Sequence, residues 1–284
     1  MNPVTTDDGL ALHLRTWPAA NPNRGVAVLV HGLGEHVDRY DHVAHRLNAL
    51  GFTVVGYDHR GHGRSPGQRG AISADDTLCA DLGRVLRVAR ESVPGPLTLV
   101  GHSLGGLIAG RFVAEGLAAA PASWWCRVDA LVMSSPALDP GTNAFQKLLL
   151  AVVAPMLPNL AVNNGLKVDW ISRDAGVVKA YAGDPLVHDR ITGRLGLFVA
   201  RQGPAVIAAA PRWKTPTLLM WAGADRCVAP AGSAAFAAAA PRDVVAVREW
   251  PGLFHEIFNE PEQGQVLDAL ADWLRAHVPE TIPA

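Results

Sequence analysis

Residues 97–106 read LTLVGHSLGG, an apolar run that ends in the pattern Gly-x-Ser-x-Gly. The pattern predicts a strand, a very sharp turn and a helix, because Gly101 and Gly105 leave room for a strained backbone around Ser103. The serine hydroxyl would then stand above the carboxyl edge of a sheet. The first N–H groups of a helix that starts at Leu104 would point to the same place, which suits a developing oxyanion. Ser103 is therefore the candidate nucleophile.

An ordinary turn is the alternative, since Gly-x-Ser-x-Gly also occurs by chance and a Gly-Gly pair after a serine is common in turns. The surroundings favour the nucleophile. A buried-looking strand precedes the pattern, a helical segment follows it, and an aspartate and a histidine occur in suitable places downstream.

Length and composition are compatible with one large α/β domain or two small ones, and a single domain with an insertion fits best. The chain has 284 residues, 49% of them hydrophobic, which is enough to bury a sizeable core. Its net charge is −1 and neither sign forms a long run, so no nucleic-acid surface is expected and a small-molecule partner is favoured. No cofactor is expected, and a monomer and a homodimer are both compatible with the sequence.

The cysteines and the apolar segments indicate which cellular compartment to expect for the protein. Cys79, Cys126 and Cys227 are far apart and lack a Cys-x-x-Cys spacing, which argues against a disulfide framework or a zinc site and favours reduced thiols in the cytoplasm. Residues 1–8 are polar, so neither a signal peptide nor an anchor is expected. The longest apolar stretch, residues 148–160, contains two prolines and is too short to span a bilayer.

Strand and helix patterns alternate through most of the chain. Residues 10–17 alternate apolar and polar side chains, which predicts an edge strand with one face in water. Further strands are predicted by apolar runs at residues 26–30, 52–57, 128–133, 216–221 and 244–250. Helices are predicted at residues 40–50, 75–89, 233–240 and 262–277, with Asp75 or Asp76 capping the second. This alternation predicts a mostly parallel sheet with helices on both faces and ligands beyond the strand carboxyl ends.

The alternation stops between residues 137 and 210, where we expect an inserted helical cap on a core made of residues 1–136 and 211–284. An apolar stripe at helical spacing is formed by Phe145, Leu148, Leu149, Val152 and Val153. Packing on the sheet could account for about half of this stripe. The remainder would accept an apolar substrate chain.

Asp225 and His255 complete the candidate catalytic set. Each follows a different predicted strand at the same end of the sheet as Ser103, in the chain order nucleophile, acid, base. The histidine would take the serine proton, and the aspartate would fix its tautomer and stabilise its charge. The backbone N–H groups of Leu33 and Leu104 would supply the oxyanion hole.

Other residues compete for these roles. Asp225 could be a turn or cap aspartate, and Asp58 and Asp184 are weaker candidates for the acid. Further histidines in strand-end loops are expected to be structural hydrogen-bonding groups: His31, His36, His59, His62 and His102.

Several motifs resemble the monoacylglycerol lipase and lysophospholipase group of α/β-hydrolases, over nearly the whole chain. They are HG-x-GEH-x-x-RY at 31–40, D-x-x-GHG-x-S at 58–65, GHS-x-GG at 101–106, Ser135-Pro136, Asp184-Pro185-Leu186 and Gly223-x-Asp225. The first is far more specific than the serine motif. The resemblance implies an α/β-hydrolase fold with a helical cap and a serine esterase that cleaves carboxylic esters of glycerol-type lipids through an acyl-enzyme on Ser103.

The same resemblance implies contacts to the substrate head group. Residues that match Glu35, Arg39, His102 and Tyr181 lie near the glycerol end of the substrate in that group. Glu35 and Arg39 could instead form an ion pair that stabilises their loop. The usual methionine after the nucleophile is Leu104 here, which leaves the oxyanion hole intact because only the backbone donates. The cap varies most within the group, so the exact ester stays open, as does transient contact of the cap with a membrane.

Three other functions are compatible with parts of this pattern. Carboxylesterase activity on small or xenobiotic esters, and peptide or thioester cleavage, would use the same Ser-Asp-His set. A non-catalytic ligand-binding sensor could share the fold, but it would not need all three residues. Halide and epoxide chemistry are disfavoured because those relatives need an aspartate in place of Ser103.

Overall fold

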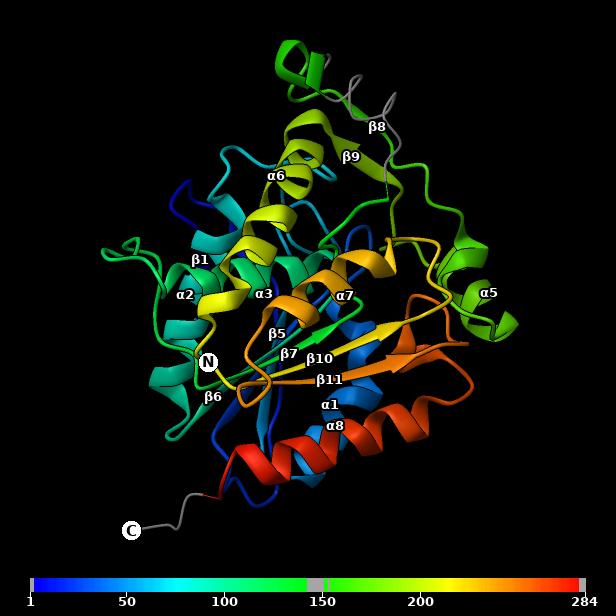
Figure 1. Cartoon of the computed structure of the whole chain (residues 1–284). Helices are drawn as coiled ribbons and strands as arrows, with labels where there is room; N and C mark the ends of the chain where they lie inside the picture. The colour runs from blue at the N-terminus through cyan, green and yellow to red at the C-terminus, as the bar shows by residue number, and fades with distance from the viewer. Residues whose placement is uncertain (1–2, 142–150, 153, 281–284) are drawn as a thin grey trace.

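A central sheet of seven strands organises the chain, of which the computed structural model describes residues 3–141, 151–152 and 154–280 (Figure 1). In chain order the strands are β3 (Leu14–Trp17), β4 (Val26–Val30), β5 (Thr53–Tyr57), β6 (Leu97–His102), β7 (Ala130–Ser134), β10 (Thr217–Ala222) and β11 (Val245–Trp250). Their spatial order is β11-β10-β7-β6-β4-β5-β3. β3 runs antiparallel to β5 at one edge, and the other neighbouring pairs are parallel. The predicted mostly parallel sheet is confirmed.

The two faces of the sheet are covered by different helices, as β4 shows. Val26, Val28 and Val30 pack in one apolar cluster, with side chains of α2 (Thr77–Ser92), α3 (Leu104–Glu115), α6 (Gly193–Ala209) and α7 (Pro230–Ala239). Ala27 and Leu29 pack in the other, with side chains of α1 (Asp41–Ala49) and α8 (Gln263–His277). In Figure 1, α1 and α8 lie on one side of the sheet and α3, α6 and α7 on the other. Burial on both faces explains why β4 is an uninterrupted apolar run.

The helices follow the predicted order. The α-helices are α1 (Asp41–Ala49), α2 (Thr77–Ser92), α3 (Leu104–Glu115), α5 (Ala175–Gly183), α6 (Gly193–Ala209), α7 (Pro230–Ala239) and α8 (Gln263–His277). Short 3₁₀ helices are η1 (Val37–Tyr40), η2 (Val168–Trp170), η3 (Ala210–Arg212) and η4 (Ile257–Asn259).

The N-terminal edge and the start of α2 differ from prediction. Instead of one strand over residues 10–17, the structure has β3 in the main sheet and a separate antiparallel pair, β1 (Val4–Thr5) and β2 (Ala11–Leu12). Within the described residues, Asp76 stands at the N-cap of α2 but its side chain makes no capping hydrogen bond. The hydroxyl of Thr77, the first residue of α2, accepts the N–H of Ala74, which lies before the helix, at 2.8 Å. The predicted aspartate cap is therefore wrong.

Residues 137–210 are not wholly helical, which corrects a second prediction. They contain the antiparallel pair β8 (Ala161–Asn163) and β9 (Arg190–Thr192) as well as α5 and α6. Pro158 and Gly165 flank β8 and are poor helix formers, so a helix is disfavoured there. Four residues of the predicted apolar stripe lie outside the described residues: Phe145, Leu148, Leu149 and Val153.

α6 connects this inserted region to the core. Its side chains Leu195, Phe198 and Val206 are buried in the same apolar cluster as α3. Gly110 of α3 allows this close packing, since a Cβ there would lie 3.3 Å from Val206. Across the described part of the chain, none of the helices combines the length and apolar character that crossing a membrane requires.

Candidate active site

Ser103 lies in the sharp turn between β6 and α3, as the glycine pattern predicts. Its backbone is strained, with φ 54° and ψ −119°. A Cβ on Gly101 would lie 2.4 Å from the carbonyl oxygen of Gly105, and one on Gly105 would lie 2.0 Å from the carbonyl oxygen of Val30. Larger residues would clash with backbone at both positions. The two glycines therefore permit the turn that presents the serine.

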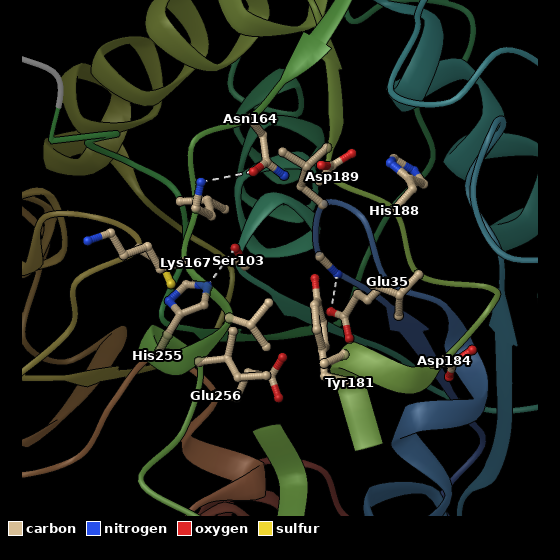
Figure 2. A pocket seen from close by; sticks show the side chains of 18 of the residues that line it. Glu35, Ser103, Asn164, Lys167, Tyr181, Asp184, His188, Asp189, His255 and Glu256 are labelled. Atoms are coloured by element: carbon tan, nitrogen blue, oxygen red, sulfur yellow. Dashed lines mark hydrogen bonds between the residues drawn. The ribbon is translucent and has the colours of Figure 1, made fainter. Parts of the chain in front are cut away.

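Ser103, His255 and Asp225 lie together at the carboxyl ends of β6, β11 and β10. The Ser103 Oγ is 2.8 Å from His255 Nε2, an interaction drawn in Figure 2, and His255 Nδ1 is 2.7 Å from Asp225 Oδ2. The other oxygen of Asp225 accepts the N–H groups of Cys227 and Val228 at 2.8 and 3.1 Å. The carboxylate is thus held in orientation, and the geometry allows a proton to pass from serine to histidine.

Electrostatics distinguish His255 from its neighbour His102. Burial lowers the pKa of His255, but the carboxylates of Asp225, Glu256 and Glu35 together raise it by more, so this pKa lies above its usual value. Burial, with the nearby charge of His255, lowers the pKa of His102 to about 3. His102 therefore stays neutral at neutral pH, whereas His255 can accept a proton.

The competing acids and histidines have other partners. Asp58 accepts the N–H groups of Val37 and Arg64 at 2.8 and 2.9 Å, which holds its own loop. Asp184 is 2.7 Å from His36. Neither carboxylate contacts His255 in the described structure.

The strand-end histidines are buried hydrogen-bonding groups. His31 Nδ1 lies 2.8 Å from the carbonyl oxygen of Gly32, and His31 Nε2 accepts the N–H of His59 at 2.9 Å. His62 Nδ1 lies 3.0 Å from the carbonyl oxygen of Arg60. Burial lowers the pKa of His31 to about 3 and keeps those of His59 and His62 well below the usual value.

Two backbone N–H groups beside Ser103 are available to a ligand. Leu104 is the first residue of α3, where N–H groups have no partner within the helix. Among the described residues, neither the Leu104 N–H nor the Leu33 N–H donates a hydrogen bond. The loop of Leu33 passes close to the serine, since a Cβ on Gly32 would lie 3.1 Å from the Ser103 Cβ.

Two cavities meet at Ser103. We call the first the polar cavity; it has a volume of about 270 Å³ and is lined by Glu35, His102, Tyr181, Asp184, His188 and Glu256, among others (Figure 2). The second, the apolar cavity, has a volume of about 420 Å³ and is lined by Leu104, Ala137, Leu157, Leu160, Val162 and Val199, among others. The residues that line both are Leu33, Ser103, Asn164, Leu166 and Cys227.

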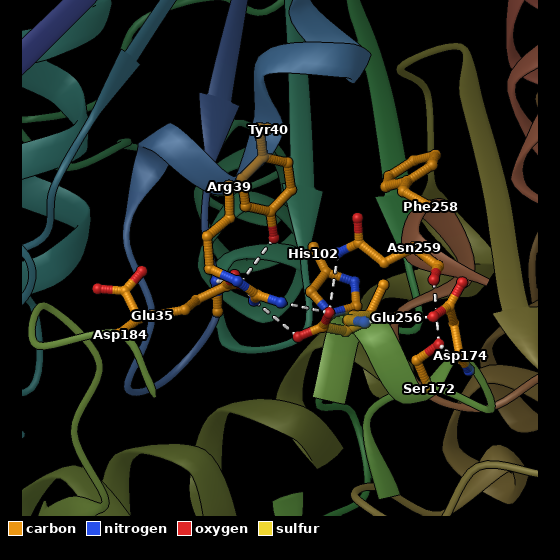
Figure 3. Close-up of polar contacts among 12 residues, drawn as sticks. Glu35, Arg39, Tyr40, His102, Ser172, Asp174, Asp184, Glu256, Phe258 and Asn259 are labelled. Carbon is orange, nitrogen blue, oxygen red and sulfur yellow. Dashed lines mark hydrogen bonds and ion pairs between the residues drawn. The ribbon is translucent and has the colours of Figure 1, made fainter. Parts of the chain in front are cut away.

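Glu35 and Arg39 form the ion pair that the sequence left as an alternative. Arg39 Nη1 is 2.5 Å from Glu35 Oε2, and the same guanidinium makes two contacts to Glu256, at 2.7 and 2.6 Å (Figure 3). Glu35 is buried and faces the polar cavity. Arg39 is not among the described residues that line that cavity.

His102 and Tyr181 both line the polar cavity. His102 Nδ1 is 3.1 Å from the hydroxyl of Ser134, which fixes its ring. The guanidinium of Arg39 lies over the Tyr181 ring, 4.6 Å from its centroid.

Sequence reasoning missed Glu256 and Cys227 as site residues, although each is close in sequence to a predicted one. Asp225, Cys227 and His255 also form the one donor group in the described residues that could hold a metal ion, with ligand atoms within 4.8 Å of one another. Burial raises the pKa of the Cys227 thiol, and the other two side chains already bond each other, so the set suits catalysis better than metal binding.

The parallel sheet with a strained serine turn after β6 defines an α/β-hydrolase. The sequence profile of a family described as serine aminopeptidase, S33, matches residues 21–262. A monoacylglycerol lipase of Mycolicibacterium smegmatis is 35% identical over 95% of this chain and 95% of its own. The chain therefore belongs to this family and to the monoacylglycerol lipase group of α/β-hydrolases, and it is an ester hydrolase.

Two further relatives extend the comparison. The crystal structure of Paleococcus ferrophilus monoacylglycerol lipase is 37% identical, covers 94% of this chain and 99% of that chain, and superposes with a TM-score of 0.81. A Bacillus subtilis phospholipase is 30% identical over 89% of this chain and 96% of its own.

Proposed function

We propose that this enzyme hydrolyses monoacylglycerols through an acyl-enzyme on Ser103. The position of Ser103, where the polar cavity meets the apolar cavity, carries the proposal. An ester with its carbonyl at this serine can place glycerol on one side and its acyl chain on the other. Lysophospholipids are the second candidate substrate, because a phospholipase is among the relatives.

In the proposed reaction, His255 takes the Ser103 proton while the serine oxygen attacks the ester carbon. Asp225 stabilises the resulting imidazolium, and the N–H groups of Leu33 and Leu104 hold the oxyanion. His255 then protonates the leaving glycerol oxygen. A water molecule, deprotonated by the same histidine, attacks the acyl-enzyme, and the bond to Ser103 breaks as His255 returns the proton to the serine oxygen, which releases the fatty acid.

Head-group contacts are proposed for His102 and Tyr181, which line the polar cavity. Glu35 also faces this cavity, but its oxygens already accept hydrogen bonds from Gly32, Arg39 and Tyr40, at 2.6, 2.5 and 2.7 Å. A glycerol hydroxyl would have to compete with these contacts. The geometry therefore favours the ion-pair role over the head-group role for Glu35 and Arg39.

We propose that residues 137–210 act as a cap that docks transiently on membranes, over a core of residues 1–136 and 211–284. Most exposed large apolar side chains of the described chain lie in one segment: Val152, Met156, Leu157, Leu160, Val162 and Leu166. A contiguous exposed apolar surface is typical of an interaction site. The last four residues of this set also line the apolar cavity, so the surface continues into the proposed acyl site.

Hydrolysis of matched esters tests the substrate. We expect a higher kcat/KM for monooleoylglycerol than for methyl oleate or oleoyl lysophosphatidylcholine, because only the first offers the polar cavity a small head group that is uncharged and carries hydroxyl groups. Ser103→Ala is the control for non-enzymatic hydrolysis. A preference for the lysophospholipid would favour the second candidate, and cleavage of aminoacyl amides but not esters would overturn the proposal.

Flotation with phosphatidylcholine vesicles tests the membrane contact. Leu157→Ser combined with Leu160→Ser should reduce the fraction of protein that floats with the vesicles. Val247→Ser on β11 is a matched control, because Val247 is also an exposed apolar residue but lies outside the cap. Equal loss in the control would contradict docking through the cap.

We also propose a reducing compartment such as the cytoplasm, because Cys79, Cys126 and Cys227 are free thiols. The choice between monomer and homodimer stays a prediction, which sedimentation of the purified protein tests.

A further inference from the structure

Two loops from distant parts of the chain must keep a fixed separation for the proposed reaction. One follows β4 and carries Leu33 with its available N–H. The other follows β11 and carries His255. Arg39, in η1, reaches both loops through Glu35 and Glu256, and Figure 3 shows the three side chains together.

Glu35 ties Arg39 to the first loop. Its Oε1 accepts the backbone N–H of Gly32 at 2.6 Å, one residue before Leu33, and the hydroxyl of Tyr40 at 2.7 Å. Its Oε2 takes the guanidinium. A shift of Arg39 would therefore move Glu35 and, through it, the backbone beside the proposed oxyanion hole.

Glu256 ties Arg39 to the second loop, because it directly follows His255 in sequence. Its carboxylate receives two parallel contacts from the guanidinium, and Asn259 Nδ2 donates to its Oε2 at 2.8 Å. Its backbone N–H donates to the carbonyl oxygen of Ile171 at 2.8 Å. The Glu256 side chain therefore has little freedom unless Arg39 moves.

Because these three side chains are largely buried, each of their charges needs a partner within the network. The side chains of Arg39, Glu35 and Glu256 are 12%, 4% and 6% exposed. Two buried carboxylates share one guanidinium, so removal of the cation would leave two like charges close together without compensation. The planar fork of arginine serves both carboxylates at once, which the single ammonium of lysine cannot do.

We propose that Arg39 is a positioning residue that joins the oxyanion-hole loop to the His255 loop, so that its contribution is to turnover rather than to head-group binding. This inference rests on the proposed roles of Ser103, His255 and Leu33. It differs from the head-group contact that the family resemblance implies for Arg39. The negative charges of Glu35 and Glu256 also act to raise the pKa of His255, which links the same network to the base.

Comparison of Arg39→Met and Arg39→Lys on two substrates tests the inference. Monooleoylglycerol has a glycerol head group and a long chain, whereas p-nitrophenyl acetate has neither. We expect Arg39→Met to lower kcat about a hundredfold on both substrates with little change in KM, because small misplacements of catalytic groups have effects of this size. Arg39→Lys should fall between this variant and the wild type. Loss on monooleoylglycerol alone, mainly in KM, would overturn the inference in favour of head-group binding.

Arg60→Met is the matched control. Arg60 is also a buried guanidinium that bridges two carboxylates, Asp8 and Asp81, but it contacts neither catalytic loop in the described structure. Its loss should lower thermal stability comparably and leave kcat within about twofold, since catalytic geometry is kept. A fall in kcat as large as that of Arg39→Met would show a general effect of destabilisation and contradict the inference.

Glu256→Gln keeps the inference testable if Arg39→Met does not fold. The acid limb of its kcat/KM profile should move to lower pH, because a charge that raises the pKa of His255 is removed. The double variant with Arg39→Lys should have a kcat no lower than the worse single variant, whereas losses that multiply would contradict a shared bridge. Wild-type protein that cleaves p-nitrophenyl acetate but not monooleoylglycerol would overturn the proposed substrate and leave this test in place.

Discussion

The hydrolase core and the inserted region differ in the exposure of their apolar side chains. Every residue of β4, β5, β6, β7 and β10 is buried, and β6 and β10 lead into Ser103 and Asp225. At Val152 and in residues 154–166, by contrast, large apolar side chains reach solvent, and Met156 is 76% exposed. We propose from this contrast a division of roles, in which the core performs the chemistry on any ester and the proposed cap favours esters with long acyl chains.

Substitution of the nucleophile should have the largest effect on turnover and should lower it equally for all substrates. Ser103→Ala should lower kcat by about 10⁶-fold, because the acyl-enzyme can no longer form. It should also abolish labelling by a fluorophosphonate while the melting temperature stays near that of the wild type. Stoichiometric labelling of the variant would show that another residue is the nucleophile.

Substitution of the acid should come next. Asp225→Asn should lower kcat by about 10⁴-fold on short and long esters with little change in KM, because it spoils the His255 tautomer and not binding. The acid limb of kcat/KM should lie above the usual histidine pKa in the wild type and move to lower pH in this variant, because the carboxylate of Asp225 raises the pKa of His255. Near-normal turnover would mean that another carboxylate, such as Asp58 or Asp184, orients the histidine.

Acid should destabilise the core through its buried histidines. His31 and His102, each with a pKa of about 3, stay neutral in the folded state, whereas the unfolded chain takes up protons near 6.5. Stability is therefore fully present above about pH 6.5 and is lost as the pH falls toward 3, by about 1.4 kcal/mol per unit for each histidine.

Urea unfolding at a series of pH values measures this loss. His102→Gln should reduce the slope of the free energy of unfolding against pH by the contribution of one histidine, roughly 1.4 kcal/mol per pH unit. His188 lies in the inserted region and its pKa is lowered less, to about 4, so the same substitution there should flatten the curve over a narrower range. An unchanged slope in His102→Gln would refute the assignment of this ring as neutral.

A cap substitution should have the smallest effect and should depend on chain length. Leu160→Ser should lower kcat/KM for monooleoylglycerol about fivefold and leave monobutyrylglycerol unchanged, because roughly 1 kcal/mol of apolar burial is lost only with the long chain. Leu160 lines the apolar cavity, whereas Leu149, part of the stripe predicted from sequence, lies outside the described residues. Equal losses on both esters would contradict the division between core and cap.

Local patterns in the sequence determined most of the core. The glycines on either side of Ser103 predict its turn because the whole pattern lies within five residues, although the backbone that Gly105 must avoid is that of Val30 on the neighbouring strand. Apolar runs predict the buried strands, because a strand covered on both faces has no polar positions to offer. The order of Ser103, Asp225 and His255 predicts their meeting, since the carboxyl ends of parallel strands share one edge of the sheet.

Where the sequence offers several possible partners for a charged or hydrogen-bonding group, only the tertiary structure decided which partner the group contacts. Arg39 could be read as a head-group contact until Glu256, 217 residues further along the chain, was found against it. The pairing of β8 with β9, whose strands lie about 30 residues apart in the chain, is of the same kind. Steric and periodic signals act over a few residues and are written in the sequence. The choice of a charge or hydrogen-bond partner depends on which distant segments the fold brings close, and only the assembled structure fixes that choice.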